Sequence, residues 1–287
     1  MPGDKYTAVW VSHSSITDFV NCPRAYFLNN IYRDPVTGHK ITVISPPLAL
    51  GQAIHEVIET LSHLPSEKRF REPLAMRFDH VWQKVSGVRG GFTDEKTESA
   101  YKARGKAMIK RIVNHPGPLA RLAVKIKMDL PYFWLSEADN IILCGKIDWL
   151  EYLPDDSVHI IDFKTGVREE DPRSLQLPIY FLLAQRCQQH PVSKMSYWYL
   201  EQSDSPKKVP LPKPKDAEKK VLKIAKEIKL ARQLKRFKCR SNGCRTCRPL
   251  EAVVRGEATL VGTDAYNQDV YIMEKPKNIE ASDSVIL

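Results

Sequence analysis

The sequence predicts an α/β fold: a mixed sheet flanked by helices, with a helical insertion and a C-terminal region that carries a cysteine cluster. Three observations predict it. Two strand patterns joined by a tight turn lie within residues 143–166, helical periodicity precedes and follows that pair, and another strand pattern occupies 194–201. With 287 residues and 43% hydrophobic content, the chain can bury a sizeable core.

A helix is predicted over residues 14–31, with Ser12 or Ser14 as its cap, because apolar side chains recur there at helical spacing. These side chains are Ile16, Phe19, Val20, Phe27 and Leu28. Pro23 should kink or break the helix, since proline lacks the backbone N–H that a helix interior requires. Cys22 would then lie where the backbone leaves helical geometry, and its sulfur would point outward.

A second helix is predicted after the Pro46-Pro47 pair. The residues expected on its buried stripe are Leu48, Gly51, His55, Ile58 and Leu61. A histidine on such a face is either a core residue with satisfied hydrogen bonds or a ligand, and the helix alone leaves both open. Residues 66–115 are predicted to form a charged helical insertion, interrupted by a glycine-bearing loop at 87–91.

Two more strands and another helix complete the predicted core. Residues 124–135 alternate in polarity and predict a strand that precedes the pair at 143–166. A helix is predicted from Asp171, its cap, to about residue 189, with a bend at Pro178. Residues 194–201 then predict a strand, so the helices would flank one mixed sheet.

The strand pair at 143–166 should bring two carboxylates and an ammonium group together. Leu153 and Ser157 are expected to pair across the tight turn. In that register Asp148 lies opposite Asp162, and Lys164 shares their face because side chains alternate along a strand. Leu150, Val158 and Ile160 are expected on the same face. The residues expected on the opposite face are Ile147, Trp149, Ile161 and Phe163.

A carboxylate between apolar layers is costly to keep ionised unless a cation or several donors compensate it, and a second carboxylate raises that cost. Hard oxygen ligands favour Mg²⁺ or Mn²⁺ as the cation. Lys164 would then steady a metal-bound hydroxide or the charge that develops at a phosphorus centre. A structural salt bridge between an aspartate and this lysine is the alternative interpretation.

The chain is basic, with 44 Lys and Arg against 34 Asp and Glu, a net charge of +10 and a pI near 9.2. This balance favours a polyanionic partner. Residues 215–236 predict a helix with a narrow apolar stripe and many cations, which either form a solvated face or follow phosphates. Its cations are Lys219, Lys220, Lys223, Lys226, Lys229, Arg232, Lys235 and Arg236.

Three cysteines follow that helix with the spacing Cys-x4-Cys-x2-Cys: Cys239, Cys244 and Cys247. Cys22 is the best candidate for a fourth ligand, since Cys144 falls on a predicted strand and Cys187 within a predicted helix. No apolar run approaches the length of a membrane span and the N-terminus lacks the hydrophobic core of a signal peptide. We therefore expect a cytoplasmic protein, no membrane contact, and metal-ligating cysteines instead of disulfides.

Together these motifs resemble, in order, those of RecB-like nucleases of the PD-(D/E)XK superfamily over roughly residues 12–250. The similarity is greatest to the iron–sulfur branch, which includes AddB and the CRISPR-associated RecB-type exonucleases. The matching motifs are Cys22-Pro23, Gly51-x3-His55, Gly145-x2-Asp148, Asp162-Phe163-Lys164-Thr165-Gly166, Gln176-x3-Tyr180 and the terminal cysteine triplet.

The resemblance implies a restriction-endonuclease-like fold and a metal-dependent deoxyribonuclease that acts as an exonuclease. It implies that Mg²⁺ or Mn²⁺ is bound by His55, Asp148, Asp162 and the carbonyl of Phe163. It assigns Lys164 as the catalytic lysine, and Gln176 and Tyr180 as residues that order the site beside DNA. It further implies a 4Fe–4S cluster held by Cys22, Cys239, Cys244 and Cys247. The spacing itself also fits a 2Fe–2S cluster, and four thiolates equally suit structural zinc.

The predicted division of the chain follows from these motifs. Its parts are an N-terminal segment at 1–47, a nuclease core at 48–205, the basic helix and cysteine loop at 206–250, and an extension at 251–287. Within the extension, residues 266–273 should add an edge strand and 280–287 should form a loose tail. One rival interpretation is an inactive DNA-binding or scaffold protein of the same fold that keeps a zinc or iron–sulfur staple. Another is a ferredoxin-like electron carrier, which the absence of a redox-partner motif disfavours. No Gly-x4-Gly-Lys-[Ser/Thr] loop occurs, so a helicase or CRISPR-adaptation partner would be a separate protein.

Overall fold

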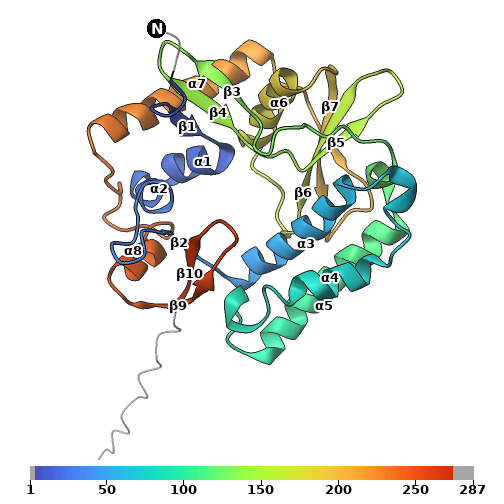
Figure 1. The fold of residues 1–287 in the computed structure, drawn as a ribbon, viewed down its shortest axis with the longest axis horizontal. Coiled ribbons are helices and arrows are strands. Elements are labelled where there is room, and N and C mark those ends of the chain that lie inside the picture. Colours follow the sequence, from blue (N-terminus) through green and yellow to red (C-terminus); the bar gives the residue numbers. More distant parts are fainter. Residues whose placement is uncertain (1–3, 274–287) are drawn as a thin grey trace, which may run out of the picture.

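A computed structural model describes residues 4–273, in which three small sheets are surrounded by helices (Figure 1). The central sheet is mixed and has the strand order β5-β6-β7-β8. Its strands are β5 (Trp149–Tyr152), β6 (Val158–Lys164), β7 (Val192–Tyr199) and β8 (Lys207–Val209). β6 pairs antiparallel with β5 and parallel with β7, which confirms the predicted α/β class with a mixed sheet. The prediction of only one sheet was wrong.

The second sheet has the order β1-β4-β3 and lies beside the central one. Its strands are β1 (Val9–Val11), β3 (Tyr132–Ser136) and β4 (Ile141–Cys144). The first strand predicted within 143–166 is therefore split, because the chain leaves this sheet after Cys144 and enters the central sheet only at Trp149. As a result Ile147 packs with the opposite apolar cluster from the one expected.

The strand predicted at 124–135 was also too long. β3 begins only at Tyr132, directly after Pro131. Between residues 121 and 131 the structure has one isolated bridge, from Ala123 to Glu151. Proline cannot donate to a strand ladder, so a strand beginning just after it is expected.

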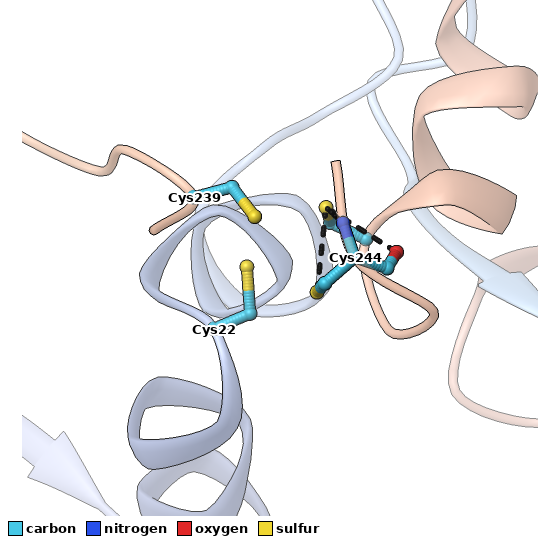
Figure 2. A group of neighbouring side chains, drawn as sticks. Cys22, Cys239 and Cys244 are labelled. Atoms are coloured by element: carbon cyan, nitrogen blue, oxygen red, sulfur yellow. Dashed lines mark hydrogen bonds between the residues drawn. The ribbon is translucent and has the colours of Figure 1, made fainter. Parts of the chain in front are cut away.

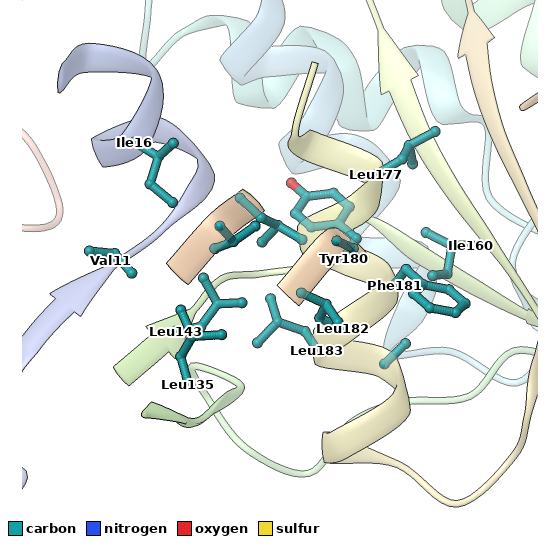
Figure 3. Close-up of a cluster of buried hydrophobic side chains, with 14 of the residues drawn as sticks. Val11, Ile16, Leu135, Leu143, Ile160, Leu177, Tyr180, Phe181, Leu182 and Leu183 are labelled. Atoms are coloured by element: carbon teal, nitrogen blue, oxygen red, sulfur yellow. The ribbon is translucent and has the colours of Figure 1, made fainter. Parts of the chain in front are cut away.

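Two large apolar clusters cover the two faces of the central sheet. One lies under α3 (Pro46–Ser62), α4 (Leu74–Trp82) and α5 (Glu95–Asn114) and includes Trp149, Ile161 and Phe163. The other lies under α6 (Gln176–Cys187) and α7 (Pro214–Gln233) and includes Leu150, Val158 and Ile160 (Figure 3). Side chains of β5 and β6 thus alternate between the clusters as the period of two predicts. The connections include three 3-10 turns: η1 (Ser66–Lys68), η2 (Gly87–Gly90) and η3 (Gly117–Ala120).

The N-terminal helical region breaks where Pro23 predicted. α1 (His13–Asn21) and α2 (Pro23–Asn30) meet at Cys22, whose backbone is extended. Ser12 caps α1 through a capping box, with its side chain accepting from the Ser15 N–H. Val20, which was expected on the apolar face, is exposed.

Two helix predictions need correction. α6 begins at Gln176 and not at Asp171, whose carboxylate instead closes a local turn by accepting from the N–H of Arg173. Pro178 therefore lies in the first turn, where a missing N–H costs nothing, and need not bend the helix. On α3, Ile58 and Leu61 are buried as predicted, but Leu48 is exposed and the buried face also includes Leu50, Ile54 and Val57. The buried face of α3 therefore overlaps the predicted stripe only in the second half of the helix.

The third sheet joins a segment near the start of the chain to the last two described strands. Its strands, in the order β2-β10-β9, are β2 (Lys40–Val43), β9 (Ala258–Thr263) and β10 (Gln268–Met273). β10 is the central strand and runs parallel to β2, so the prediction of an edge strand was wrong. The sheet packs with α2 and α8 (Arg248–Val254) around a small apolar cluster that includes Cys22 and Cys247. The tail predicted at 280–287 lies outside the described residues. No helix within residues 4–273 combines the length and hydropathy needed to cross a bilayer.

A buried arginine fixes α3 to the central sheet. Arg69 is 4% exposed, and its side chain donates to carbonyl oxygens at and just beyond the ends of α3 and η3. These acceptors belong to Leu61, Leu64, Leu119 and Arg121. Its guanidinium also lies 4.8 Å from the ring centroid of Trp149 on β5. Nothing in the sequence pattern pointed to this residue, because its acceptors are backbone groups.

We expect Arg69→Ala to lower the free energy of unfolding by about 2–4 kcal/mol, because it removes a charged donor from several buried carbonyl groups. Urea denaturation measures this change in the free energy of unfolding, provided that both proteins have the same m-value. Arg71→Ala is the matched control, since Arg71 is exposed, and it should change the midpoint little. Equal midpoints for both variants would contradict a structural role for Arg69.

Candidate functional site

The turn between β5 and β6 has the predicted register. The Leu153 N–H donates to the carbonyl of Ser157 at 2.8 Å, and Trp149 pairs with Ile161. The same register places Asp148, just before β5, opposite Asp162. The Asp148 Oδ2 accepts from the backbone N–H of Phe163 at 3.0 Å. Because the chain changes sheets just before Asp148, this carboxylate is held by β6 and not by a regular ladder of its own strand.

Asp162 is the buried acid of the site, with 1% of its side chain exposed. Its Oδ1 accepts from Gln176 Nε2 at 2.6 Å. Its Oδ2 forms an ion pair with Lys164 Nζ at 3.0 Å. A carboxylate oxygen has two lone pairs, so Oδ2 can bind a metal cation in addition to this ammonium.

Both carboxyl groups bind their protons more tightly than an exposed aspartate does. Burial raises the pKa of Asp148 to about 6. Burial also raises the pKa of Asp162 to about 7, and the neighbouring charge of Asp148 adds to that effect. A divalent cation between them would stabilise the ionised forms. It would thus counteract the burial and the mutual repulsion that raise these pKa values. The electrostatics therefore fit a metal site.

His55 reaches the acids from α3. Its Nδ1 lies 3.4 Å from Asp148 Oδ2, and the backbone of Phe163 lies close enough to affect its pKa. Burial lowers the pKa of His55, although 40% of its side chain is exposed. A neutral imidazole with a lone pair can bind a metal. Gly51, one turn earlier, faces the residue after β6: a Cβ at this position would lie 3.4 Å from Thr165 Oγ1, in ordinary van der Waals contact.

Direct contacts connect the four groups that are expected to bind metal. His55 contacts both Asp148 and the backbone of Phe163, and Asp148 contacts Phe163 in turn. Asp148 and Asp162 also lie close enough for each to change the pKa of the other. The structure thus brings the predicted ligands together at the end of β6, and their binding of a metal stays a prediction.

Lys164 lies at the end of β6 and is held by two acids. Its Nζ is 3.0 Å from Asp162 Oδ2 and 3.2 Å from Glu170 Oε2. Burial alone would lower the pKa of Lys164, but these carboxylates outweigh it and raise the pKa. The group is therefore a cation at neutral pH and suits electrostatic stabilisation better than proton abstraction. Sequence reasoning missed Glu170, because it lies in an irregular loop with no spacing that relates it to Lys164.

Gln176 and Tyr180 occupy successive turns on one side of α6, as predicted. The side-chain amide of Gln176 donates to Asp162 and also accepts from Lys164 Nζ, so it connects the acid and the lysine. Its Nε2 lies 3.4 Å from the Tyr180 hydroxyl. Burial raises the pKa of Tyr180 well above its usual value, so it is a neutral donor at the edge of the site. Their predicted position beside DNA stays a prediction.

The four predicted cysteines come together at a second site (Figure 2). The sulfur atoms of Cys22, Cys239, Cys244 and Cys247 all lie within 4.8 Å of one another. Cys22 comes from the break between α1 and α2, and the others come from the loop before α8. The two remaining cysteines pack elsewhere, where Cys144 donates to the carbonyl of Val11 and Cys187 to that of Tyr132.

Backbone groups favour thiolates at this second site. The N–H of Gly243 donates to Cys239 Sγ at 3.4 Å, and the N–H of Cys244 donates to Cys247 Sγ at 3.3 Å. Hydrogen bonds from backbone N–H groups, chiefly that of Cys247, lower the pKa of Cys244 to about 6. Burial raises the pKa of Cys22 to about 12, so this thiol would ionise only with a metal beside it. The donor set fits zinc or an iron–sulfur cluster.

Comparison with known proteins agrees with this geometry. The sequence pattern described as PD-(D/E)XK nuclease superfamily matches residues 10–250, which is most of the chain. The chain belongs to the PD-(D/E)XK nuclease superfamily. The matched region includes Asp148, Asp162 and Lys164.

Individual relatives of this PD-(D/E)XK protein are distant. It is 26% identical over 164 residues to an ATP-dependent helicase/deoxyribonuclease subunit of Streptococcus pyogenes serotype M12, strain MGAS2096. It is 25% identical over the same length to the corresponding protein from serotype M6. Each match covers 56% of this chain but only 14% of the relative, so the chain corresponds to a small part of those proteins.

We expect the purified protein to contain bound iron or zinc, and Cys22→Ser to lose most of it, because three thiolates bind less tightly than four. Elemental analysis by mass spectrometry measures the ratio of metal to protein, and a brown colour indicates iron–sulfur. Cys187→Ser is the matched control, since Cys187 lies in α6 away from the sulfur group. Equal metal content in the two variants would remove Cys22 from the ligand set.

Proposed function

We propose that this PD-(D/E)XK protein is a metal-dependent deoxyribonuclease that hydrolyses DNA phosphodiester bonds, acting as an exonuclease. One observation carries the proposal: two buried carboxyl groups with raised pKa values lie beside a charged lysine, which pairs with Asp162 at 3.0 Å. His55, Asp148, Asp162 and the Phe163 carbonyl would hold Mg²⁺ or Mn²⁺. When bound, the ion supplies a water of lowered pKa and polarises the phosphate.

The residues of the chain have separate roles in this mechanism. The Lys164 ammonium stabilises negative charge that develops on the phosphate oxygens, and it is preorganised by its contacts with Asp162 and Glu170. Gln176 fixes the carboxylate of Asp162 and the ammonium of Lys164 relative to each other. The apolar clusters on both faces of the sheet exclude water and strengthen these charge interactions.

The four cysteines are proposed to hold a 4Fe–4S cluster with a structural role, with 2Fe–2S and zinc as the alternatives. The site joins the break after α1 to the loop before α8, and so connects two distant parts of the chain. The streptococcal relatives are helicase/deoxyribonuclease proteins, which supports DNA as the substrate and a separate helicase as a partner. A CRISPR-adaptation partner and a cytoplasmic location stay predictions.

The inactive DNA-binding or scaffold protein remains the second candidate, but no observation favours it. Asp148, Asp162 and Lys164 are all present and mutually arranged, whereas loss of catalysis would relax the constraint on them.

We expect Asp162→Asn and Lys164→Ala each to lower kcat on labelled DNA with Mg²⁺ or Mn²⁺ by about 10²-fold or more, since each removes a preorganised charge. Asp129→Asn and Lys208→Ala are the matched controls, because both residues are exposed and neither contacts the acids or Lys164. Gel analysis of end-labelled single-stranded and double-stranded DNA measures the rates and separates exonuclease from endonuclease products. Full activity in both site variants would exclude the mechanism.

The basic helix α7 is proposed to contact DNA phosphates. Lys226 pairs with Asp139 at 2.8 Å and Lys229 donates to the Asp139 carbonyl, so these two cations anchor the helix. Lys219, Lys220 and Lys223 are exposed on the same helix. They are therefore the cations best placed to bind phosphate.

We expect the triple variant Lys219→Gln, Lys220→Gln and Lys223→Gln to bind DNA more weakly, with a salt dependence reduced by roughly one ion per lost phosphate contact. Fluorescence anisotropy over a salt series measures both quantities. The matched control replaces three exposed lysines of the helical insertion: Lys68, Lys96 and Lys110. If the two triple variants have equal salt slopes, α7 is a solvated face.

A further inference from the structure

An open groove of about 830 Å³ lies between α3 and the β9–β10 hairpin. His55, Glu59 and Lys146 line it on one side, and Tyr266 lines it from the hairpin. Since His55 also contacts Asp148, the groove adjoins the candidate active site. A strand that extends from the acids past His55 would enter this groove.

The hairpin is a feature of this chain beyond the family match. The match ends at residue 250, whereas β9 and β10 span Ala258–Met273. The hairpin is nevertheless anchored in the fold, because β10 pairs along β2, the strand that leads into α3. The hairpin thus forms one wall of the groove beside the candidate active site.

The tip of the hairpin presents a tyrosine from a rigid turn. The carboxylate of Asp264 accepts from the backbone N–H groups of Tyr266 and Gln268, at 2.8 Å and 2.9 Å. Asn267 takes the left-handed conformation that closes the turn, with φ of 55°. The ring of Tyr266 extends from this turn and is 79% exposed. Because Tyr266 also lines the groove, its ring is available to a ligand that lies there.

Charge alone would attract nucleic acid only weakly to the groove. Its lining cations Lys84, Arg89 and Lys146 are matched by three carboxylates, those of Glu56, Glu59 and Asp264. Two of the cations are already paired, Lys84 with Glu56 and Lys146 with Glu59. A strand that lies here needs another source of affinity, and base stacking on an aromatic ring supplies one.

We propose that the β9–β10 hairpin guides a single strand of nucleic acid to the catalytic site, with Tyr266 stacking against an unpaired base. The inference rests on the proposed nuclease function for its ligand. Bases in an intact duplex already stack on each other and leave no face for Tyr266, so the hairpin selects single strands.

The test measures binding of a fluorescein-labelled oligothymidylate, with Ca²⁺ in place of Mg²⁺, by fluorescence anisotropy. Tyr266→Ala should weaken binding about tenfold, because base stacking of this kind contributes about 1–3 kcal/mol. Tyr266→Phe keeps the ring and should bind nearly as well as the parent. Tyr6→Ala is the matched control, since Tyr6 is 87% exposed and does not line the groove. Thermal unfolding verifies that all variants are folded.

A second probe, the same strand with one 2-aminopurine, reports stacking directly through fluorescence quenching. Quenching that is lost in Tyr266→Ala and kept in Tyr266→Phe supports the proposal, whether or not the parent cleaves DNA. A parent that cleaves DNA while Tyr266→Ala binds and quenches like the parent overturns the hairpin's role but leaves the nuclease intact. A parent that does not bind the strand overturns the hairpin's role as well.

Discussion

The burial of two carboxyl groups at Asp148 and Asp162 is the constraint on which the rest of the structure depends. Both lie where apolar clusters cover the two faces of a narrow sheet, and both have raised pKa values as a result. Two such charges repel each other and lack hydration, so their ionised forms require a nearby cation. Lys164 supplies one positive charge, and a divalent ion would supply the remainder. The surrounding layers then keep water out and make each of these interactions stronger.

The cysteine site lies in a part of the fold that has only a small apolar core. The cluster of apolar side chains around Cys22 and Cys247 is far smaller than the two that cover the central sheet, yet it has to join α2, α8 and the third sheet. A small apolar core gives little stability by itself. Four thiolates around a metal would couple folding to binding and offset that deficit. The ion pair between Arg24 and Glu251 spans the same interface but is partly exposed, so it adds little.

Local rules predicted much of this site from the sequence. The turn at 154–157 and the period of two were sufficient for the register that places Asp148 opposite Asp162, and Pro23 was sufficient for the break at Cys22. The predictions that failed depend on contacts between segments that are far apart in the sequence. The pairing of β10 with β2 joins residues more than two hundred positions apart and leaves no local pattern. Likewise the change of sheet before Trp149, and the contact of Glu170 with Lys164, depend on packing that no spacing encodes.

The position of His55 on α3 shows the limit of prediction from a single apolar stripe. Such a stripe predicts one buried face that carries His55. In α3, Leu50, Ile54 and Val57 face the core, while Gly51 faces the end of β6 and His55 lines the groove. Anything that shifts α3 must therefore move the active site and the groove wall together. A hairpin added beside this helix can act on the strand that enters without altering the acids and the lysine, which lie on the sheet.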